Sequence, residues 1–164
     1  MGVSGSGKST IGALLAETLG VRFVDGDDLH PASNVAKMAS GLPLTDDDRW
    51  PWLAEVGRTM ATSADTGVVV ACSALKRSYR DAILAESPMT TFVLLSAPRD
   101  IFLHRLKTRH GHFMPTSLLD SQLADLESLQ PDEPGTIVDA QPSPEHIVAT
   151  VVDALGAGGG AVSD

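Results

Sequence analysis

The apolar positions of this 164-residue chain fall into two kinds of segment. Short runs of apolar residues predict strands, and they lie at 21–24, 67–72, 91–95 and 136–139. Between them, helical spacing of apolar residues together with start and stop signals predicts helices at 10–19, 31–38, 49–64, 76–85, 98–109, 116–128 and 143–155. The run at 67–72 is typical of a strand buried on both faces. Strands that alternate with helices in this way predict a parallel sheet covered by helices on both sides.

Polar residues follow the predicted strands at one edge of this sheet. Residues 25–28 and 73–76 and Asp139 each come directly after a strand. In parallel α/β sheets, ligands bind beyond the carboxyl ends of the strands. We therefore expect one domain over residues 1–155 with its site at this edge, followed by a disordered Gly- and Ala-rich tail at 156–164.

The first ten residues, M-G-V-S-G-S-G-K-S-T, contain G-x-x-x-x-G-K-[ST], the pattern of a phosphate-binding loop. Glycines let consecutive backbone N–H groups turn inward toward a polyphosphate, and the following helix N-terminus adds positive potential. Lys8 is expected to reach the β- and γ-phosphates, and the Ser9 hydroxyl is expected to take a Mg²⁺ position. A plain connection before a helix is the alternative interpretation. The predicted nucleotide-binding residues of this segment are Gly2, Ser4, Gly5, Ser6, Gly7, Lys8, Ser9 and Thr10.

This loop normally follows a buried strand, and here only Met1 precedes it. We therefore expect the first strand of the sheet to be missing or truncated. An N-terminal extension of several residues is expected to supply it.

The charge and composition of the chain argue against several classes of function. With 12 basic and 21 acidic residues the net charge is −9, which argues against general binding to nucleic acids or anionic membranes. No apolar run approaches the ~18 residues of a membrane span, and the N-terminus lacks a signal-peptide core. The single cysteine, Cys72, excludes an internal disulfide and is expected to be an inert thiol in a buried strand. We expect a cytoplasmic protein that acts on a small molecule.

Two carboxylates, Asp25 and Asp27, lie two positions apart directly after a predicted strand, so both can face one cleft. A carboxylate can orient or deprotonate an attacking hydroxyl, and oxygen ligands suit Mg²⁺. A solvated acidic turn, or an Asx turn that starts the next helix, would give the same spacing. The phosphate loop upstream favours the functional interpretation.

The acidic run at 46–48 is interpreted as the first turn of a helix, where carboxylates complement the helix dipole. Arg49 follows it directly, and either pairs with these acids or binds an anionic substrate. Trp50 and Trp52 flank Pro51 and are interpreted as packing residues.

Two pairs of cations are spaced four residues apart on predicted helices. Lys76 and Arg80 either face the site or form a surface basic pair. Arg105 and Arg109 lead into a glycine-interrupted segment, which suits a mobile lid over about 105–118 that closes over phosphates; a solvated helix face has the same pattern. The chain lacks an Asp at the end of the central strand and an Asn-Lys-x-Asp motif, which disfavours hydrolytic nucleotide switches.

Taken together, these segments resemble the gluconate kinases (gluconokinases), a branch of the shikimate-kinase-like P-loop kinases. Beyond the first ten residues, the resemblance rests on D-G-D-D-L-H-P-x-x-N-x-x-K-M, G-x-P-L-x-D-D-D-R-x-P-W-L, C-S-A-L-K-R-x-Y-R-D and R-L-K-x-R-x-G-H-F. The first ten residues mark only a P-loop protein, whereas the next three motifs are specific in order and spacing. The resemblance implies a three-layer α/β sandwich with a parallel sheet, helices on both faces and a mobile lid. It also implies ATP- and Mg²⁺-dependent phosphorylation of D-gluconate at its 6-hydroxyl, giving 6-phospho-D-gluconate, and it suggests a homodimer.

The resemblance also implies roles for individual residues. Asp27 would orient or deprotonate the hydroxyl, Arg49 would bind the substrate carboxylate, and Arg105 would lie near the adenine. The expected catalytic residues are Lys8, Asp27 and Arg109, and the expected metal ligands are Ser9 and Asp25. The expected substrate-binding residues are Asp27, His30, Asn34, Lys37, Arg49, Ser73, Lys76 and Arg80. The nucleotide-binding set also includes Arg105, Arg109 and Pro142.

Two other functions remain open at this point. Another small-molecule kinase of the same branch, such as shikimate kinase, would carry a ring-binding Gly-Gly-Gly where this chain has Cys72-Ser73-Ala74. A nucleotide-binding module without catalysis would bind ATP and show no turnover with any acceptor.

Overall fold

The computed structural model describes residues 1–108 and 116–158 of the chain. Every strand and helix that the sequence predicts is present, with boundaries shifted by a few residues. The strands are β1 (Arg22–Asp25), β2 (Val68–Ala71), β3 (Phe92–Ser96) and β4 (Gly135–Asp139). The helices are α1 (Lys8–Leu19), α2 (Ala32–Ala39), α3 (Asp46–Ala61), α4 (Arg77–Glu86), α5 (Arg99–Thr108), α6 (Thr116–Asp125) and α7 (Pro144–Gly158), with a short 3-10 helix η1 (Gly26–Leu29). The last helix continues past its predicted end at residue 155, and residues 159–164 lie outside the described part.

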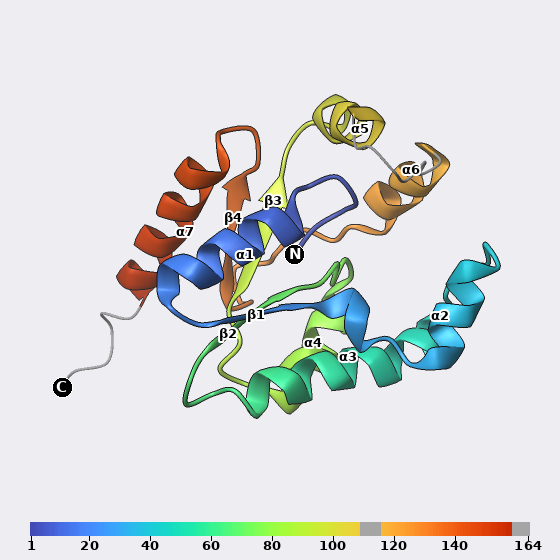
Figure 1. Cartoon of the computed structure of the whole chain (residues 1–164), viewed down its shortest axis with the longest axis horizontal. Helices are drawn as coiled ribbons and strands as arrows, with labels where there is room; N and C mark the ends of the chain where they lie inside the picture. Colours follow the sequence, from blue (N-terminus) through green and yellow to red (C-terminus); the bar gives the residue numbers. More distant parts are fainter. Residues whose placement is uncertain (109–115, 159–164) are drawn as a thin grey trace.

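The strands are parallel and lie between two layers of helices, as the alternating pattern predicted (Figure 1). Helices α1 and α7 pack side by side on one face, and α3 and α4 pack together on the other. Each layer has its own apolar core. One core centres on Val3, Leu15 and Phe102, and the other on Trp52, Val56 and Ile83.

Helix α3 begins three residues before its predicted start. The Thr45 hydroxyl accepts the Asp48 N–H, and the Asp48 carboxylate accepts the Thr45 N–H, so the two residues form a capping box. The acidic run 46–48 therefore forms the first helical turn, and its charges complement the helix dipole.

The sheet is divided into two halves, β1–β2 and β3–β4, and the N-terminus lies between them. The Met1 amino group donates to Val93 O at 2.6 Å, and Leu95 N–H donates to Met1 O at 3.0 Å. Gly2 N–H donates to Ser73 O, just beyond β2. Met1 is therefore paired with β3, directly before the phosphate loop.

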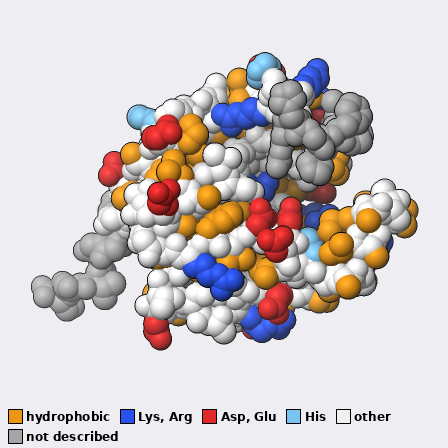
Figure 2. Space-filling model, in the orientation of Figure 1, with side chains coloured by type: hydrophobic (Ala, Val, Ile, Leu, Met, Phe, Trp, Pro, Cys, Tyr) orange, Lys and Arg blue, Asp and Glu red, His pale blue; other side chains and the backbone are white. Residues whose placement is uncertain are grey.

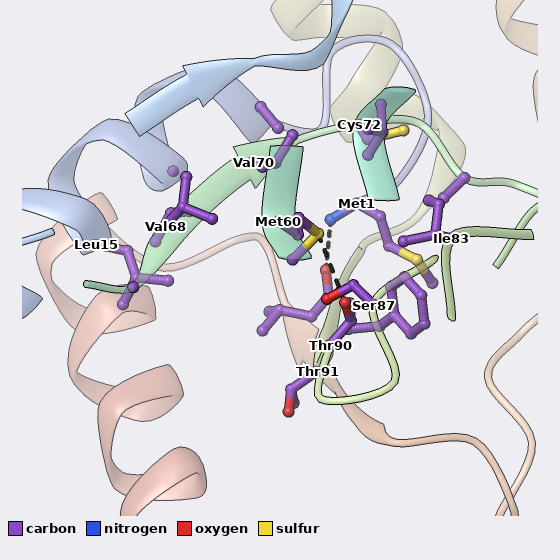
Figure 3. A pocket seen from close by; sticks show the side chains of 18 of the residues that line it. Met1, Leu15, Met60, Val68, Val70, Cys72, Ile83, Ser87, Thr90 and Thr91 are labelled. Atoms are coloured by element: carbon purple, nitrogen blue, oxygen red, sulfur yellow. Dashed lines mark hydrogen bonds between the residues drawn. The ribbon is translucent and has the colours of Figure 1, made fainter. Parts of the chain in front are cut away.

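A cavity of about 400 Å³ continues from Met1 between the two halves of the sheet (Figure 3). Val68, Val69 and Val70 of β2 line it and are only half-buried. The prediction that this strand is buried on both faces is therefore wrong for these three residues, because one edge of β2 borders the cavity. Cys72 also lines the cavity; burial raises the pKa of its thiol to about 11, as expected for an unreactive cysteine.

Candidate active site

The phosphate loop lies between Met1 and the N-terminus of α1, at the carboxyl end of the sheet. Gly5 has a φ of 79°, and a Cβ there would approach Phe102 O to 2.9 Å, so the close packing of the loop on α5 requires glycine. The Lys8 Nζ donates to Val3 O at 3.1 Å, which holds the ammonium over the loop.

The start of α1 fits a phosphate. Its N-cap is Gly7 in the left-handed region, and no side chain caps the first-turn N–H groups. The Ser6 hydroxyl, 1% exposed, has no hydrogen-bond partner among the described residues. A helix N-terminus with uncapped amides and a nearby ammonium is a ready anion site.

Asp25 connects this loop to η1, α2 and the start of α3, which carry most of the expected substrate-binding residues and are called the acceptor side below. Its Oδ2 accepts from the Ser9 hydroxyl at 2.9 Å, and its Oδ1 accepts from Asp27 N–H at 3.2 Å. Asp25 thus caps η1 in the manner of an Asx turn, as one structural alternative expected. It is not a purely solvated acidic turn, because its other oxygen also binds Ser9 of the phosphate loop. The structure therefore brings together the two expected metal ligands and places Asp27 two residues after Asp25, in the first turn of η1.

No group of three or more His, Cys, Asp or Glu side chains suited to a metal occurs in the described ranges. Ser9 and Asp25 fit Mg²⁺, which is usually held by one or two protein oxygens together with water and phosphate oxygens.

Trp52 of α3 packs against the acceptor side through two contacts. Its indole N–H donates to Gly26 O at 2.7 Å, and its ring stacks on His30 with centroids 4.2 Å apart. Burial lowers the pKa of His30, although the nearby Asp27 acts in the opposite direction. Trp52 is thus a packing residue, as predicted, and it also holds the backbone next to Asp27.

Helix α2 is fastened to the start of α3. The Asn34 side chain donates to Asp48 O at 2.7 Å and contacts His30 Nδ1 at 3.3 Å. Lys37 forms an ion pair with the Asp48 carboxylate. The Lys37 ammonium, followed by the Thr45 backbone and hydroxyl, lowers the pKa of Asp48 to about 2. The expected substrate residues His30, Asn34 and Lys37 therefore form one connected group, in which Lys37 already has an anionic partner.

In Figure 2, acidic side chains gather over η1, beside a hollow that separates α2 from the upper half of the molecule. The face of α2 and the following loop leaves Val35, Met38 and Leu42 exposed.

Arg49 and Lys76 both lie near the ring of Tyr79, a residue that the sequence analysis did not select. The Arg49 guanidinium lies 5.7 Å and the Lys76 Nζ 5.3 Å from the centroid of the Tyr79 ring. The Tyr79 hydroxyl donates to Asp46 at 2.6 Å, and Lys76 pairs with the same carboxylate at 3.3 Å. The hydrogen bond from Tyr79, then that from Lys76, lowers the pKa of Asp46. Arg49 makes no ion pair with any described residue, and its one hydrogen bond among them is a long contact of 3.4 Å to Leu44 O.

Arg80 does not belong to the acceptor site. The prediction is wrong because this side chain is 0% exposed and fully engaged. It pairs with Glu133 through two hydrogen bonds and donates to the carbonyls of Ala74, Leu75 and Glu127. Arg80 joins α4 to the acidic loop before β4. Ser73 is half-buried, and its carbonyl binds Gly2 N–H.

On the nucleotide side, Arg105 donates to Ala140 O at 2.6 Å, next to Gln141 and Pro142. The two segments expected at the adenine therefore lie together. Arg109 and residues 109–115 of the expected lid lie outside the described residues.

Comparison with known proteins decides the family. The shikimate kinase family matches residues 4–155. The thermosensitive gluconokinase of Escherichia coli K12 is 47% identical over 136 residues, which cover 81% of this chain and 72% of that protein. The gluconokinase of Gluconobacter oxydans 621H is 45% identical and covers 93% and 86%. This chain belongs to the gluconokinases of the shikimate kinase family.

Solved structures agree with this membership. A gluconokinase from Sinorhizobium meliloti 1021 is 46% identical and has a TM-score of 0.87, covering 96% of this chain and 89% of that one. Shikimate kinase from Aquifex aeolicus, at 18% identity and a TM-score of 0.63, shares the fold. The predicted P-loop kinase fold and the resemblance to gluconokinases are confirmed.

Some residues of this gluconokinase site carried no clear sequence signal. Asp46, Trp52 and Tyr79 owe their place to contacts between distant elements. Gln122 of α6 is a fourth: its Oε1 accepts from Ser4 N–H of the phosphate loop at 2.7 Å. Asp46, Trp52 and Tyr79 lie inside the quoted family motifs, which was the only hint available. Among the helices that the structure describes, none combines the length and apolar content of a membrane span.

Proposed function

We propose that this gluconokinase transfers the terminal phosphoryl group of ATP to the 6-hydroxyl of D-gluconate, with Mg²⁺ as cofactor. Phosphoryl transfer needs little covalent chemistry from a protein, so its residues act by positioning and by charge. The products are ADP and 6-phospho-D-gluconate, and the hydroxyl proton leaves through a carboxylate.

The observation that carries the proposal is the Ser9–Asp25–Asp27 connection, at 2.9 and 3.2 Å. It sets a donor loop and an exposed carboxylate in fixed relation, which is what in-line transfer between two bound substrates requires. In this proposal, Asp27 orients the 6-hydroxyl and accepts its proton. Lys8 and the N-terminus of α1 bind the phosphates, and Ser9 and Asp25 hold Mg²⁺, which neutralises phosphate charge when bound.

Arg49 is the cation best suited to the gluconate carboxylate. Lys37, Lys76 and Arg80 already have carboxylate partners, namely Asp48, Asp46 and Glu133. Arg49 instead lies over an aromatic ring, and a planar guanidinium can bind a carboxylate through two parallel hydrogen bonds. His30 and Asn34 supply short polar groups for the sugar hydroxyls.

ADP release from Mg·ATP, measured with gluconate, shikimate, other aldonates and glucose, tests this assignment. We expect gluconate to give the highest kcat/KM, and chelation of Mg²⁺ to abolish turnover. Faster turnover with shikimate or glucose would contradict the substrate assignment. If no acceptor raised ADP release above the rate without acceptor, the protein would be a nucleotide-binding module without catalysis. We place the reaction in the cytoplasm, which cell fractionation can test.

A further inference from the structure

One hydrogen bond joins the phosphate loop to helix α6, far along the chain. Ser4 N–H donates to Gln122 Oε1 at 2.7 Å, although the two residues are 118 positions apart. In Figure 1 the loop between the N-terminus and α1 bends toward α6. Among the described residues, this is the one bond between a side chain and a backbone N–H of residues 2–7. It connects the donor loop to a helix to which the proposed reaction assigns no residue.

The bond fixes the orientation of one peptide group of the loop. The Val3 carbonyl accepts from Ser6 N–H at 3.2 Å and from the Lys8 Nζ at 3.1 Å, so it points into the loop. All described peptide bonds are trans. The C=O and N–H of a trans peptide point in opposite directions, so Ser4 N–H points out of the loop, toward α6. By accepting this N–H, Gln122 keeps the Val3 carbonyl turned toward Lys8.

Helix α6 is itself anchored, so it can hold the Gln122 amide in place. Leu119, three residues before Gln122, is 0% exposed and lies in the same apolar core as Val3. Residues three apart share a helix face, so the face that carries Leu119 and Gln122 is the one packed toward the loop. Asp120 of α6 also pairs with Arg99 of α5, at 2.6 and 3.1 Å. Apolar packing and a surface ion pair therefore support the amide.

A neutral acceptor suits this position. Ser4 N–H is half-buried, and a buried donor without a partner destabilises the conformation that buries it. Lysine and arginine side chains cannot accept a hydrogen bond. A carboxylate could accept it, but would place negative charge beside a loop that is proposed to bind phosphates. The glutamine amide accepts the N–H without adding charge.

We infer that Gln122 is a positioning residue of the donor site. It holds the peptide between Val3 and Ser4 in one orientation, and through the Val3 carbonyl it holds the Lys8 ammonium over the loop. The inference rests on the proposed function in one respect, that Lys8 and the loop bind the phosphates of ATP. Without the amide, the peptide would be free to turn, and nucleotide binding would have to order it again. Because this ordering opposes binding, the affinity for Mg·ATP would fall.

Three single variants of the full chain test this inference: Gln122→Met, Gln122→Glu and Asp120→Ala. Methionine keeps the length of the side chain and accepts hydrogen bonds poorly, whereas glutamate keeps an oxygen for Ser4 N–H. Asp120→Ala is the matched control, because it removes the ion pair that ties α6 to α5 and leaves Gln122 unchanged. Amide hydrogen exchange at Ser4, the Kd for Mg·ATP in the absence of gluconate, and Tm are measured for each variant.

We expect Gln122→Met to speed exchange at Ser4 and to raise the Kd for Mg·ATP, each about 10-fold, and to lower Tm by less than ~3 °C. Gln122→Glu should keep Ser4 protected. Asp120→Ala should leave exchange at Ser4 and the Kd within ~2-fold of the original protein, because an exposed ion pair contributes little.

Three results would overturn the inference. The first is unchanged exchange at Ser4 in Gln122→Met, or faster exchange with an unchanged Kd for Mg·ATP. The second is an equal rise of the Kd in Asp120→Ala, because loosening of α6 alone would then explain it. The third is loss of protection at Ser4 in Gln122→Glu, a result that stays available if Gln122→Met does not fold.

None of these measurements uses gluconate, so failure of the inference differs from failure of the proposed function. A protein that binds Mg·ATP and loses protection at Ser4 in Gln122→Met, but phosphorylates no acceptor, would contradict the proposed function alone.

Discussion

Asp25 is the residue through which the two halves of the proposed reaction meet. Its two carboxylate oxygens have different partners, the Ser9 hydroxyl on one side and Asp27 N–H on the other. These two hydrogen bonds hold the carboxylate in place, so Asp27 is positioned relative to the phosphate loop through Asp25. This is the pre-organisation that transfer between two small substrates requires.

Replacing Asp27 with asparagine should therefore affect catalysis and leave folding unchanged. The amide keeps the size of the side chain and cannot accept the hydroxyl proton, so kcat should fall at least ~100-fold. Asp28→Asn is the matched control, since Asp28 is an exposed neighbour in the same 3-10 helix. Steady-state ADP release and Tm are measured for both proteins. Near-normal turnover of Asp27→Asn would remove Asp27 from this role.

Arg49 should act on gluconate binding. Arg49→Ala removes the proposed partner of the substrate carboxylate, and KM for gluconate should rise ~10- to 100-fold while KM for ATP changes little. Arg58→Ala on the same helix is the control, because Arg58 is exposed and pairs only with Glu55 among the described residues. A KM for gluconate equal in the two variants would contradict the carboxylate assignment.

At the scale of elements, α3 organises the acceptor side. Its first turn caps itself through Thr45 and Asp48 and holds Lys37 of α2. One turn later, Trp52 holds His30 and the carbonyl of Gly26. The helix therefore positions η1 and α2 together, and a change in its first two turns should be felt in both.

The buried pair of Arg80 and Glu133 serves another connection, between α4 and the loop before β4. Arg80→Ala leaves Glu133 without its partner, so the free energy of unfolding should fall by about 3 kcal/mol or more. The comparison variant is Arg77→Ala on the same helix, whose pair with Asp132 is exposed. Urea unfolding measures both. A stable Arg80→Ala protein with a raised KM for gluconate would return Arg80 to the acceptor site.

These two arginines show where sequence reasoning reached its limit. The phosphate loop, the strands and Asp25 with Asp27 could be predicted, because glycine spacing, apolar runs and strand ends are local features. Arg80 could not, since an i,i+4 basic pair has the same spacing whether it faces solvent or a buried carboxylate 53 residues away. The partner of Tyr79 likewise depends on how α3 packs on α4.

At the scale of the whole molecule, two packed halves meet at the N-terminus. One half contains β1, β2, α3 and α4, and the other contains β3, β4 and α7. Met1, Gly2 and α1 connect them at the point where the phosphate loop begins. The stability of this junction therefore affects the geometry of the donor site directly.

The junction predicts how stability depends on pH. Burial lowers the pKa of the Met1 amino group from 8.0 to about 5, so between these values the unfolded chain binds a proton that the folded chain does not. The free energy of unfolding should then decrease as pH falls from 8 to 5, by at most about 4 kcal/mol from this group. His30, whose pKa is lowered from 6.5, adds a smaller loss of stability of the same sign below that pH.

Urea unfolding at pH 8, 6.5 and 5 measures how the free energy of unfolding changes with pH. The same measurement on His30→Gln removes the contribution of the histidine from this slope. In the chain acetylated at Met1, an amide N–H replaces the amino group, so most of the slope between pH 8 and 6.5 should disappear. A slope that is the same with and without the acetyl group would show that the amino group at this junction does not control it.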